Sequence, residues 1–363
     1  WVLSPFRLAL WLGVGFGGSA MNQDEYIIYH LQVTTLTPLH IGTGRNLLNE
    51  YDYAIYNGHT WRIHERLLLE AQDVEDPHLA SLLARKPPVQ LLKPADYKAD
   101  SPFFRYVIRG TPRSMGEGAQ LREQLKDLYN RPYLPGSSLK GALRTSLAWY
   151  GWQARKLQPD RLMLDEKRAK FASRRYEQEL FGRDPNHDLL RALQVSDSNP
   201  VGTDSLMLVN AKVITARGEG SPIEIEAIRS ETAFKSSLKL DWKLFSNWAS
   251  NAKGGGFRLG GSRTWLDKLV NIARAHTMER VQILRRWFEN RHLMNIAGFY
   301  ADLERMNLSE GQFVIQLGWG GGWDSKTFGV ARLTPNFIDW VVKHYSLARG
   351  KHQSGDPFPK SRR

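Results

Sequence analysis

The sequence predicts an α+β protein built on a mostly antiparallel sheet, and three observations predict this class. Several short segments alternate apolar and polar residues, which is typical of strands that bury one face. One longer segment, residues 138–150, carries its apolar residues at helical spacing instead. The expected elements follow one another as strand, helix, strands, helices and strand, which favours an α+β protein over a parallel α/β sheet.

The first 20 residues, WVLSPFRLALWLGVGFGGSA, differ in composition from the sequence that follows them. The apolar run from Leu8 to Gly18 resembles a signal-peptide core, but it is too short to span a bilayer. Met21 precedes NQDEYIIYH, which is typical of the start of a soluble protein. We therefore expect residues 1–20 to be a non-native leader, whereas a true secretion signal would contradict a cytoplasmic location.

The first predicted strand begins at Tyr26. It covers residues 26–34 and buries one alternating set of side chains: Ile27, Tyr29, Leu31 and Val33. The strand leads into TPLHIGTGR at 37–45, which we expect to be a glycine loop that ends in a basic residue.

A β-hairpin is predicted next, because Asn57-Gly58 separates the strand-like residues 51–56 from 60–63. Asn-Gly between two such segments is the strongest short-range hairpin signal. A helix is expected over residues 65–72. Residues 85–118 are rich in proline and glycine with mixed charge, so we expect an extended insertion or a mobile loop there.

The predicted helix at 138–150 carries one continuous apolar stripe: Leu139, Ala142, Leu143, Ser146, Leu147 and Tyr150. Pro135 and Gly136 mark the turn before it, and Ser137 or Ser138 can cap its free N–H groups. Lys140 and Arg144 lie near this end, where the helix dipole disfavours a cation by about 0.3–1 kcal/mol. A bound anion would reverse this penalty, so the pattern indicates either a phosphate site or a solvated basic face.

The segment does not match the P-loop that binds the phosphates of a nucleotide. Gly136 and Gly141 have the P-loop spacing, but Ala142 and Leu143 stand where that motif needs its lysine and hydroxyl residue. The chain has 50 Lys and Arg against 37 Asp and Glu, a formal charge of +13, which favours nucleic acid as the anion. It has no cysteine, which excludes disulfides and suits a reducing cytoplasm.

The second half of the chain completes the pattern. Strands are predicted over 193–197, 206–214 and 223–228, a long helix over 262–292, a strand over 313–317 and a loosely ordered tail over 349–363. A ferredoxin-like βαββαβ core with insertions is the simplest arrangement of these elements.

A second glycine loop, GWGGG at 318–322, follows the last predicted strand. Consecutive glycines let the backbone approach a ligand closely, and their N–H groups can form an anion nest. We expect Lys326 to meet a phosphate. Trp319 and Trp323 can stack on bases or cover the core, and for Trp319 the core is the favoured alternative.

Together these segments resemble the RAMP superfamily of CRISPR-associated RNA-binding proteins. Within this superfamily they most resemble the family of the fifth Csm subunit of type III-A effector complexes. The resemblance extends over most of residues 26–363. It rests on LTPLHIGTG at 36–44, YLPGSSLKGALRTSL at 133–147, LQVSDS at 193–198, IEIEAIRSETAF at 223–234, LGWGGGWDSKTFG at 317–329 and FPKSRR at 358–363.

The resemblance implies an RRM-like RAMP fold in a cytoplasmic ribonucleoprotein that acts in antiviral defence. The subunit would cap the backbone at the 3′ part of the CRISPR RNA and support its maturation without being an enzyme. CRISPR RNA and other RAMP subunits are the implied partners, target RNA is a further one, and no cofactor, metal or membrane is implied. The residues implied to contact RNA or an adjoining subunit are Gly42, Gly44, Arg45, Gly136, Ser137, Ser138, Lys140, Arg144, Gly320, Gly321, Gly322 and Lys326.

The same resemblance divides the chain after the leader into an RRM-like RAMP region over 21–230, with its insertion near 85–118, and a helical, second RAMP-like region over 231–363. A type III-B RAMP subunit is an alternative, since such a subunit also carries PGSSLKG. A generic RNA chaperone is another alternative that the composition allows.

The main rival function is a metal-independent endoribonuclease that processes CRISPR RNA. His40, beside the first glycine loop, is its candidate for proton transfer, but the sequence offers no obvious acid or base partner. Asp197 follows a strand and is interpreted as structural, and Asp324 is a lone acid in the second glycine loop. Because no carboxylates cluster in the sequence, a two-metal nuclease is not expected.

Overall fold

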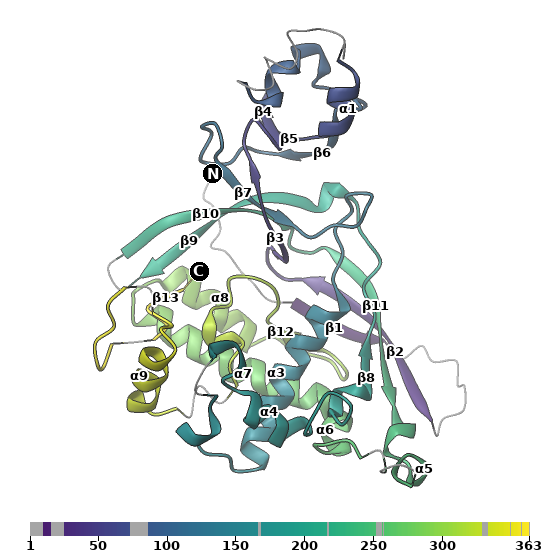
Figure 1. Ribbon diagram of the computed structural model, residues 1–363, viewed down its shortest axis with the longest axis vertical. Helices are drawn as coiled ribbons and strands as arrows, with labels where there is room; N and C mark the ends of the chain where they lie inside the picture. Colours follow the sequence, from purple (N-terminus) through teal and green to yellow (C-terminus); the bar gives the residue numbers. More distant parts are fainter. Residues whose placement is uncertain are drawn as a thin grey trace.

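The computed structural model confirms the α+β class, with helices packed on mostly antiparallel sheets (Figure 1). The structure describes residues 10–15, 25–72, 86–165, 168–215, 218–251, 256, 258–328, 333–348, 350–356 and 358–362. Within these ranges, no helix combines the length and the apolar composition needed to cross a bilayer.

A ferredoxin-like succession of elements forms the centre of the protein. The βαββαβ order is given by β2 (Tyr26–Thr35), α3 (Gly136–Ala154), β8 (Leu193–Val195), β11 (Ala233–Asp241), α7 (Leu269–Glu289) and β12 (Phe313–Ile315). The sheet order is β12-β1-β2-β11-β8, with every neighbouring pair antiparallel. The inserted strand β1 (Leu10–Gly15) belongs to the expected leader, and residues 1–9 and 16–24 lie outside the described residues.

Two further sheets stand on this centre. The larger has the order β13-β9-β10-β7-β3, and its strands are β13 (Ser361–Arg362), β9 (Leu206–Thr215), β10 (Gly218–Ile228), β7 (Gln120–Gln124) and β3 (Gly42–Leu48). The smaller has the order β4-β5-β6 and stands with α1 at the top of Figure 1; it contains β4 (Tyr53–Tyr56), β5 (His59–Ile63), β6 (Phe104–Arg109) and α1 (Glu65–Glu70).

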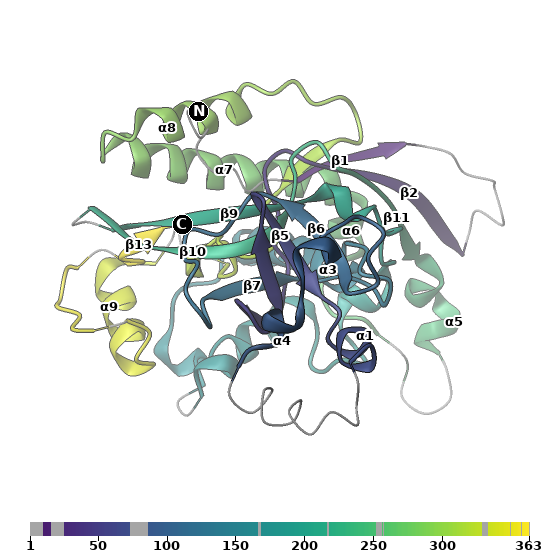
Figure 2. The same cartoon turned by 90° about the horizontal axis from the view of Figure 1, so that it is seen from above.

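Helices fill the lower half of the molecule in Figure 1, and α7 lies side by side with α8 in Figure 2. The remaining α-helices are α4 (Arg174–Phe181), α5 (Asn247–Ser250), α6 (Arg263–Asp267), α8 (Met294–Glu304) and α9 (Pro335–His344). Short 3₁₀ helices are η1 (Pro88–Leu91), η2 (Pro94–Asp96), η3 (Arg161–Met163), η4 (Ala169–Phe171), η5 (Leu189–Arg191), η6 (Thr203–Ser205), η7 (Trp242–Phe245) and η8 (Trp323–Ser325).

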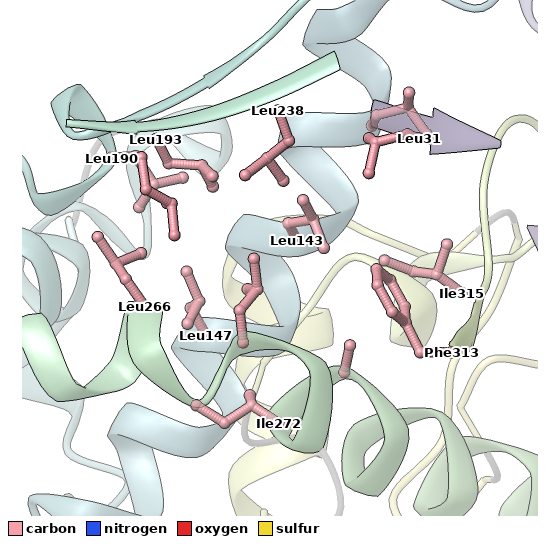
Figure 3. Packing of buried hydrophobic residues seen from close by; sticks show 14 of the residues in the cluster. Leu31, Leu143, Leu147, Leu190, Leu193, Leu238, Leu266, Ile272, Phe313 and Ile315 are labelled. Atoms are coloured by element: carbon pink, nitrogen blue, oxygen red, sulfur yellow. The ribbon is translucent and has the colours of Figure 1, made fainter. Parts of the chain in front are cut away.

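The main core lies between the first sheet and helices α3, α6 and α7 (Figure 3). The predicted stripe of α3 supplies three fully buried leucines: Leu139, Leu143 and Leu147. They pack with strand residues such as Leu31 and Phe313. Burying one such side chain stabilises the fold by about 1.5–3 kcal/mol relative to leaving it exposed. The hydrophobic stripe therefore fixes which side of α3 meets the sheet.

The hairpin signal of the first half is confirmed. Asn57 and Gly58 both have positive φ, as a two-residue hairpin turn requires, and they join β4 to β5. Part of the expected loop at 85–118 is instead a strand, because β6 pairs with β5 and its Tyr106 and Ile108 are buried. The expected single helix over 262–292 is interrupted at Lys268, which separates α6 from α7.

The tail is more ordered than expected. Ser361 and Arg362 form β13, which pairs with β9, and Arg362 is buried. The expected division at residue 230 falls between two strands of one sheet, since β2 and β11 pair along nine residues, from Ala233 opposite Thr34 to Asp241 opposite Tyr26.

The α3–α7 interface carries a pH-sensitive group. His276 of α7 lies 3.0 Å from Ser146 Oγ of α3 through Nδ1, and burial, with a smaller contribution from Arg280, lowers its pKa to about 4. Between about pH 6.5 and pH 4 the unfolded chain binds a proton that the folded chain does not. We therefore expect the free energy of unfolding to decrease as the pH is lowered through this window, by up to about 1.4 kcal/mol per pH unit for this group.

Chemical denaturation at a series of pH values measures this dependence. The variant His276→Gln keeps a polar side chain but cannot titrate, so its stability should fall less steeply between pH 6.5 and 4. Equal slopes for the variant and the parent protein would show that His276 does not carry the effect.

Candidate nucleic-acid interface

The two predicted glycine segments lie together in the folded protein, although almost 280 residues separate them in sequence. The N–H of Trp319 donates a hydrogen bond to the carbonyl oxygen of His40 at 2.8 Å. Gly318 has a φ of +80°, and a Cβ there would lie 2.6 Å from the same oxygen. Only glycine fits this contact, because both the backbone conformation and the space exclude a side chain.

The first glycine segment is a strand rather than the expected loop from Gly42 onward. β3 pairs with β7, and the register shifts between Gly42 and Asn46. Gly44 has a φ of +88° within this irregular part, and a Cβ on Gly42 would lie 2.8 Å from Nε2 of His40. The glycines therefore allow the strand to bulge and to pass close to the histidine ring.

The N-terminus of α3 borders the same place, but the predicted serine cap is wrong. Pro135 is the N-cap residue, and neither serine side chain caps the helix. The N–H of Gly136 instead donates to Oδ1 of Asp197 at 2.7 Å. This bond confirms the structural interpretation of Asp197, which supplies the anion that the helix terminus needs. Ser137 and Ser138 are thereby free to face outward.

These elements enclose a cleft of about 700 Å³, which we call the glycine cleft. Its walls come from residues 40–46, from one side of α3 between Ser137 and Thr145, from Arg122 and Glu123 of β7, and from 316–319 with 325–326. Of the predicted site residues, Gly42, Gly44, Arg45, Ser137, Ser138 and Lys326 line it.

Three cations and one carboxylate line the glycine cleft. Arg45 lies 2.5 Å from Oδ1 of Asp52 and keeps 56% of its side chain exposed. Arg122 lies over the ring of Trp319, with 4.9 Å between its Cζ and the ring centroid. Lys326 is exposed at the end of the second glycine segment. Glu123 is the carboxylate. The excess positive charge suits a phosphate-bearing strand.

Lys140 and Arg144 do not join these cations. They line a different cleft between α3 and α4, and Arg144 is bound to Asp188 at 2.7 Å and to Glu177 at 3.1 Å. Ser138 and Lys140 are two residues apart, so the helix directs their side chains to different sides. Lys140 and Arg144 are therefore separate from the residues that line the glycine cleft.

Gly320, Gly321 and Gly322 shape the second segment but are not among the residues that line the cleft. Gly320 and Gly322 have φ of +99° and +81°, which favours glycine at both positions. Trp323 packs edge-on against Phe358, at 5.0 Å between ring centroids, rather than facing the cleft. Trp319 contacts the buried cluster of β9 and β10, as the core alternative predicted.

Asp324 is not a lone acid. It is 5% exposed and lies 3.0 Å from Arg280 of α7 and 2.7 Å from Arg362 of β13. Burial alone would raise the pKa of its carboxyl, but the two guanidinium groups hold the pKa below its usual value. This buried cluster ties the second glycine segment to both a core helix and the C-terminal strand.

His40 forms part of the cleft wall but is only 2% exposed. Its Nδ1 donates to the carbonyl oxygen of Glu226 at 2.6 Å, and Trp319 lies edge-on to the ring at 6.0 Å. Burial lowers the pKa of His40, so the ring is neutral near pH 7. Within the described ranges, no three His, Asp or Glu side chains are grouped so that they could hold a metal ion.

Sequence reasoning missed Arg122 and the partners of Asp324. Arg122 lies in β7, a strand inside a segment without a clear alternating signal. Arg362 and Asp324 both lie in segments that carry the family resemblance. That the two segments belong to the same set was the one sequence feature that could have indicated their contact.

The sequence model of the RAMP superfamily matches residues 32–323 of this chain. Among curated proteins the chain is similar to the "CRISPR system Cms protein Csm5" of two Mycobacterium tuberculosis strains, with 26% identity over 242 residues, 62% of this chain. The matched region spans 58% of the length of those relatives. The protein of the same name from Streptococcus thermophilus is 26% identical over 141 residues, 34% of this chain and 39% of that protein.

Among solved structures, the fold is similar to a chain in a cryo-EM structure of a Csm–crRNA–target RNA ternary complex of a type III-A CRISPR-Cas system. The TM-score is 0.67 at 24% identity, and the match covers 91% of this chain and 95% of that chain. The crystal structure of T. onnurineus Csm5 matches with a TM-score of 0.53 at 23% identity, covering 87% and 93% of the two chains. At this identity the likeness concerns the fold.

Proposed function

The chain belongs to the RAMP superfamily, and from this membership we propose that it is the Csm5-like, RNA-binding subunit of a type III-A CRISPR effector complex in the cytoplasm. In this role it holds the 3′ part of the CRISPR RNA at the end of the complex and supports RNA maturation. The glycine cleft is the observation that carries the proposal, because it joins three cations, glycine-rich backbone and the hydroxyls of Ser137 and Ser138.

The size and composition of the cleft support a single strand of RNA. A volume of about 700 Å³ accommodates a few nucleotides rather than a duplex. Arg45 and Lys326 lie on different walls, so they can neutralise successive phosphates of a strand that passes between them. The hydroxyls of Ser137 and Ser138 add hydrogen-bond donors beside the helix terminus.

The comparisons favour this assignment over the alternatives. The similar chain of known structure comes from a complex that contains crRNA and target RNA, and the curated relatives carry the name Csm5. This similarity favours type III-A over type III-B. For a nuclease, His40 would need access to the RNA, but its ring is buried and its Nδ1 is occupied by a main-chain oxygen. We therefore propose a non-catalytic role.

Removing two cleft cations tests the proposal. In the double variant Arg45→Ala/Lys326→Ala, we expect weaker binding of a single-stranded RNA oligonucleotide and a salt slope of log K that falls by about 1.4 units, about 0.7 for each lost phosphate contact. Fluorescence anisotropy titrations at several salt concentrations measure both quantities. The same mixtures, analysed without added metal on a denaturing gel, should contain uncut RNA.

The matched control is Arg66→Ala/Lys343→Ala, which removes one arginine and one lysine at exposed positions of α1 and α9. Its affinity and salt slope should stay close to those of the parent protein. Equal losses in both double variants would contradict a specific role for the glycine cleft, and cut RNA would support the nuclease.

A further inference from the structure

A second basic cleft lies on the other side of α3 from the glycine cleft. It has a volume of about 550 Å³ and is formed by Lys140 and Arg144 of α3, by 170–178 at the start of α4 and by 182–191. We call it the α4 cleft. Its cations come from several segments: Lys140, Arg144, Lys170, Arg174, Arg183 and Arg191. Among the described residues, the two clefts have no lining residue in common.

The α4 cleft differs from the glycine cleft in its acids. Three carboxylates stand among its six cations: Glu177, Asp184 and Asp188. Glu177 and Asp184 keep 38% and 41% of their side chains exposed. Exposed carboxylates at these positions repel a phosphodiester backbone, which carries a charge at every residue. A protein segment with spaced acidic side chains avoids them, because its charges are separated by neutral residues.

The cations of the α4 cleft are held in different ways. Arg144 is fixed by Glu177 and Asp188 and lies over Phe181, 4.1 Å from its centroid. In the described part of the chain, neither Lys140 nor Arg174 has a carboxylate within 4.0 Å. Arg144 therefore shapes the wall, whereas Lys140 and Arg174 are available to an incoming acid.

An exposed aromatic side chain lines the same cleft. Phe171 is 36% exposed, and Nζ of Lys170 lies 4.7 Å from its ring centroid. Aromatic and arginine side chains that line one cleft are typical of the centre of a protein–protein interface. In the glycine cleft the aromatic ring beside a cation is that of Trp319, which packs against β9 and β10.

We propose that the α4 cleft docks an acidic segment of a neighbouring protein subunit, with Lys140 and Arg174 binding its carboxylates and Phe171 packing against its apolar side chains. The proposal depends on the proposed function in one respect, namely that the protein works in an assembly. It separates two tasks on the two sides of α3: the glycine cleft binds RNA and the α4 cleft binds protein.

Charge reversal in the α4 cleft tests the proposal. The variant Lys140→Glu/Arg174→Glu should be retained about tenfold less in a complex co-purified with the other co-expressed Csm subunits, because it now repels the acidic segment. Its affinity for the single-stranded RNA oligonucleotide, measured on the isolated chain, should change less than about twofold, with an unchanged salt slope. The milder variant Lys140→Gln/Arg174→Gln, with thermal unfolding of both, separates loss of docking from loss of folding.

The glycine-cleft variant Arg45→Ala/Lys326→Ala serves as the reciprocal control, with weaker RNA binding by the isolated chain. Normal retention of Lys140→Glu/Arg174→Glu in the complex would overturn the docking proposal. A loss of RNA affinity in that variant equal to the loss in the glycine-cleft variant would make the α4 cleft an RNA site. If the glycine-cleft variant binds RNA as tightly as the parent protein while Lys140→Glu/Arg174→Glu is lost from the complex, the RNA proposal fails and the docking proposal stands.

Discussion

Replacing Asp324 with alanine should destabilise the protein by about 3–5 kcal/mol, because it leaves two buried cations without their counter-charge. Arg280 and Arg362 are both 8% exposed, and Asp324 is the carboxylate that contacts each of them. Several buried nitrogens of the two arginines already have no hydrogen-bond partner in the described part of the chain. The remaining contacts therefore offer little compensation for the lost carboxylate.

Chemical denaturation, followed by circular dichroism, measures this loss. The matched control is Asp302→Ala, which removes a carboxylate that is 63% exposed and bound to Arg305 at the surface. That change should cost at most about 1 kcal/mol. A loss for Asp324→Ala no larger than that of the control would show that the cluster does not support the fold.

Replacing Gly136 with alanine should destabilise the protein by about 3 kcal/mol, since overpacking against a fixed backbone forces α3 away from β8. A Cβ at this position would lie 2.2 Å from the carbonyl oxygen of Val195 and 2.7 Å from backbone atoms of Ser196. The shift would also stretch the bond from Gly136 to Asp197, which occupies the helix terminus.

Gly141 provides a control in the same helix. It also lies in α3, but a Cβ there has no neighbour within 4 Å among the described residues. Gly141→Ala should therefore stabilise the protein by up to about 1 kcal/mol through helix propensity. Thermal or chemical unfolding of the two variants measures the contrast, and similar changes at both glycines would contradict the role assigned to the α3–β8 contact.

Asp324 and Gly136 each hold one wall of the glycine cleft in place. Asp324 holds the segment that ends in Lys326, and Gly136 holds the helix terminus that presents Ser137 and Ser138. These two walls are thus held by polar contacts outside the cleft, of which the Asp324 cluster is buried and the Gly136–Asp197 bond is partly buried. Because these walls are already fixed, the protein would lose less conformational entropy on binding RNA in the cleft.

Local patterns in the sequence were sufficient for part of the fold. The alternation after Tyr26 predicted β2, Asn57-Gly58 predicted the hairpin, and the stripe from Leu139 predicted α3. These signals succeed because each element's periodicity follows from its own backbone geometry. β6 and β13 have only weak periodicity of their own. They form strands because β6 pairs with the edge of β5 and β13 pairs with the edge of β9.

The sequence by itself determined the elements, the excess of positive charge and the glycine positions, because propensity, composition and backbone freedom are local properties. Only the tertiary structure decided which side of α3 faces which cleft, so Lys140 and Arg144 are separated from Arg45 and Lys326. It also decided that Asp197 occupies the helix terminus and that Arg362 reaches Asp324. These contacts join residues that are distant in the chain, and their partners are set by how the sheets and helices pack rather than by any local pattern.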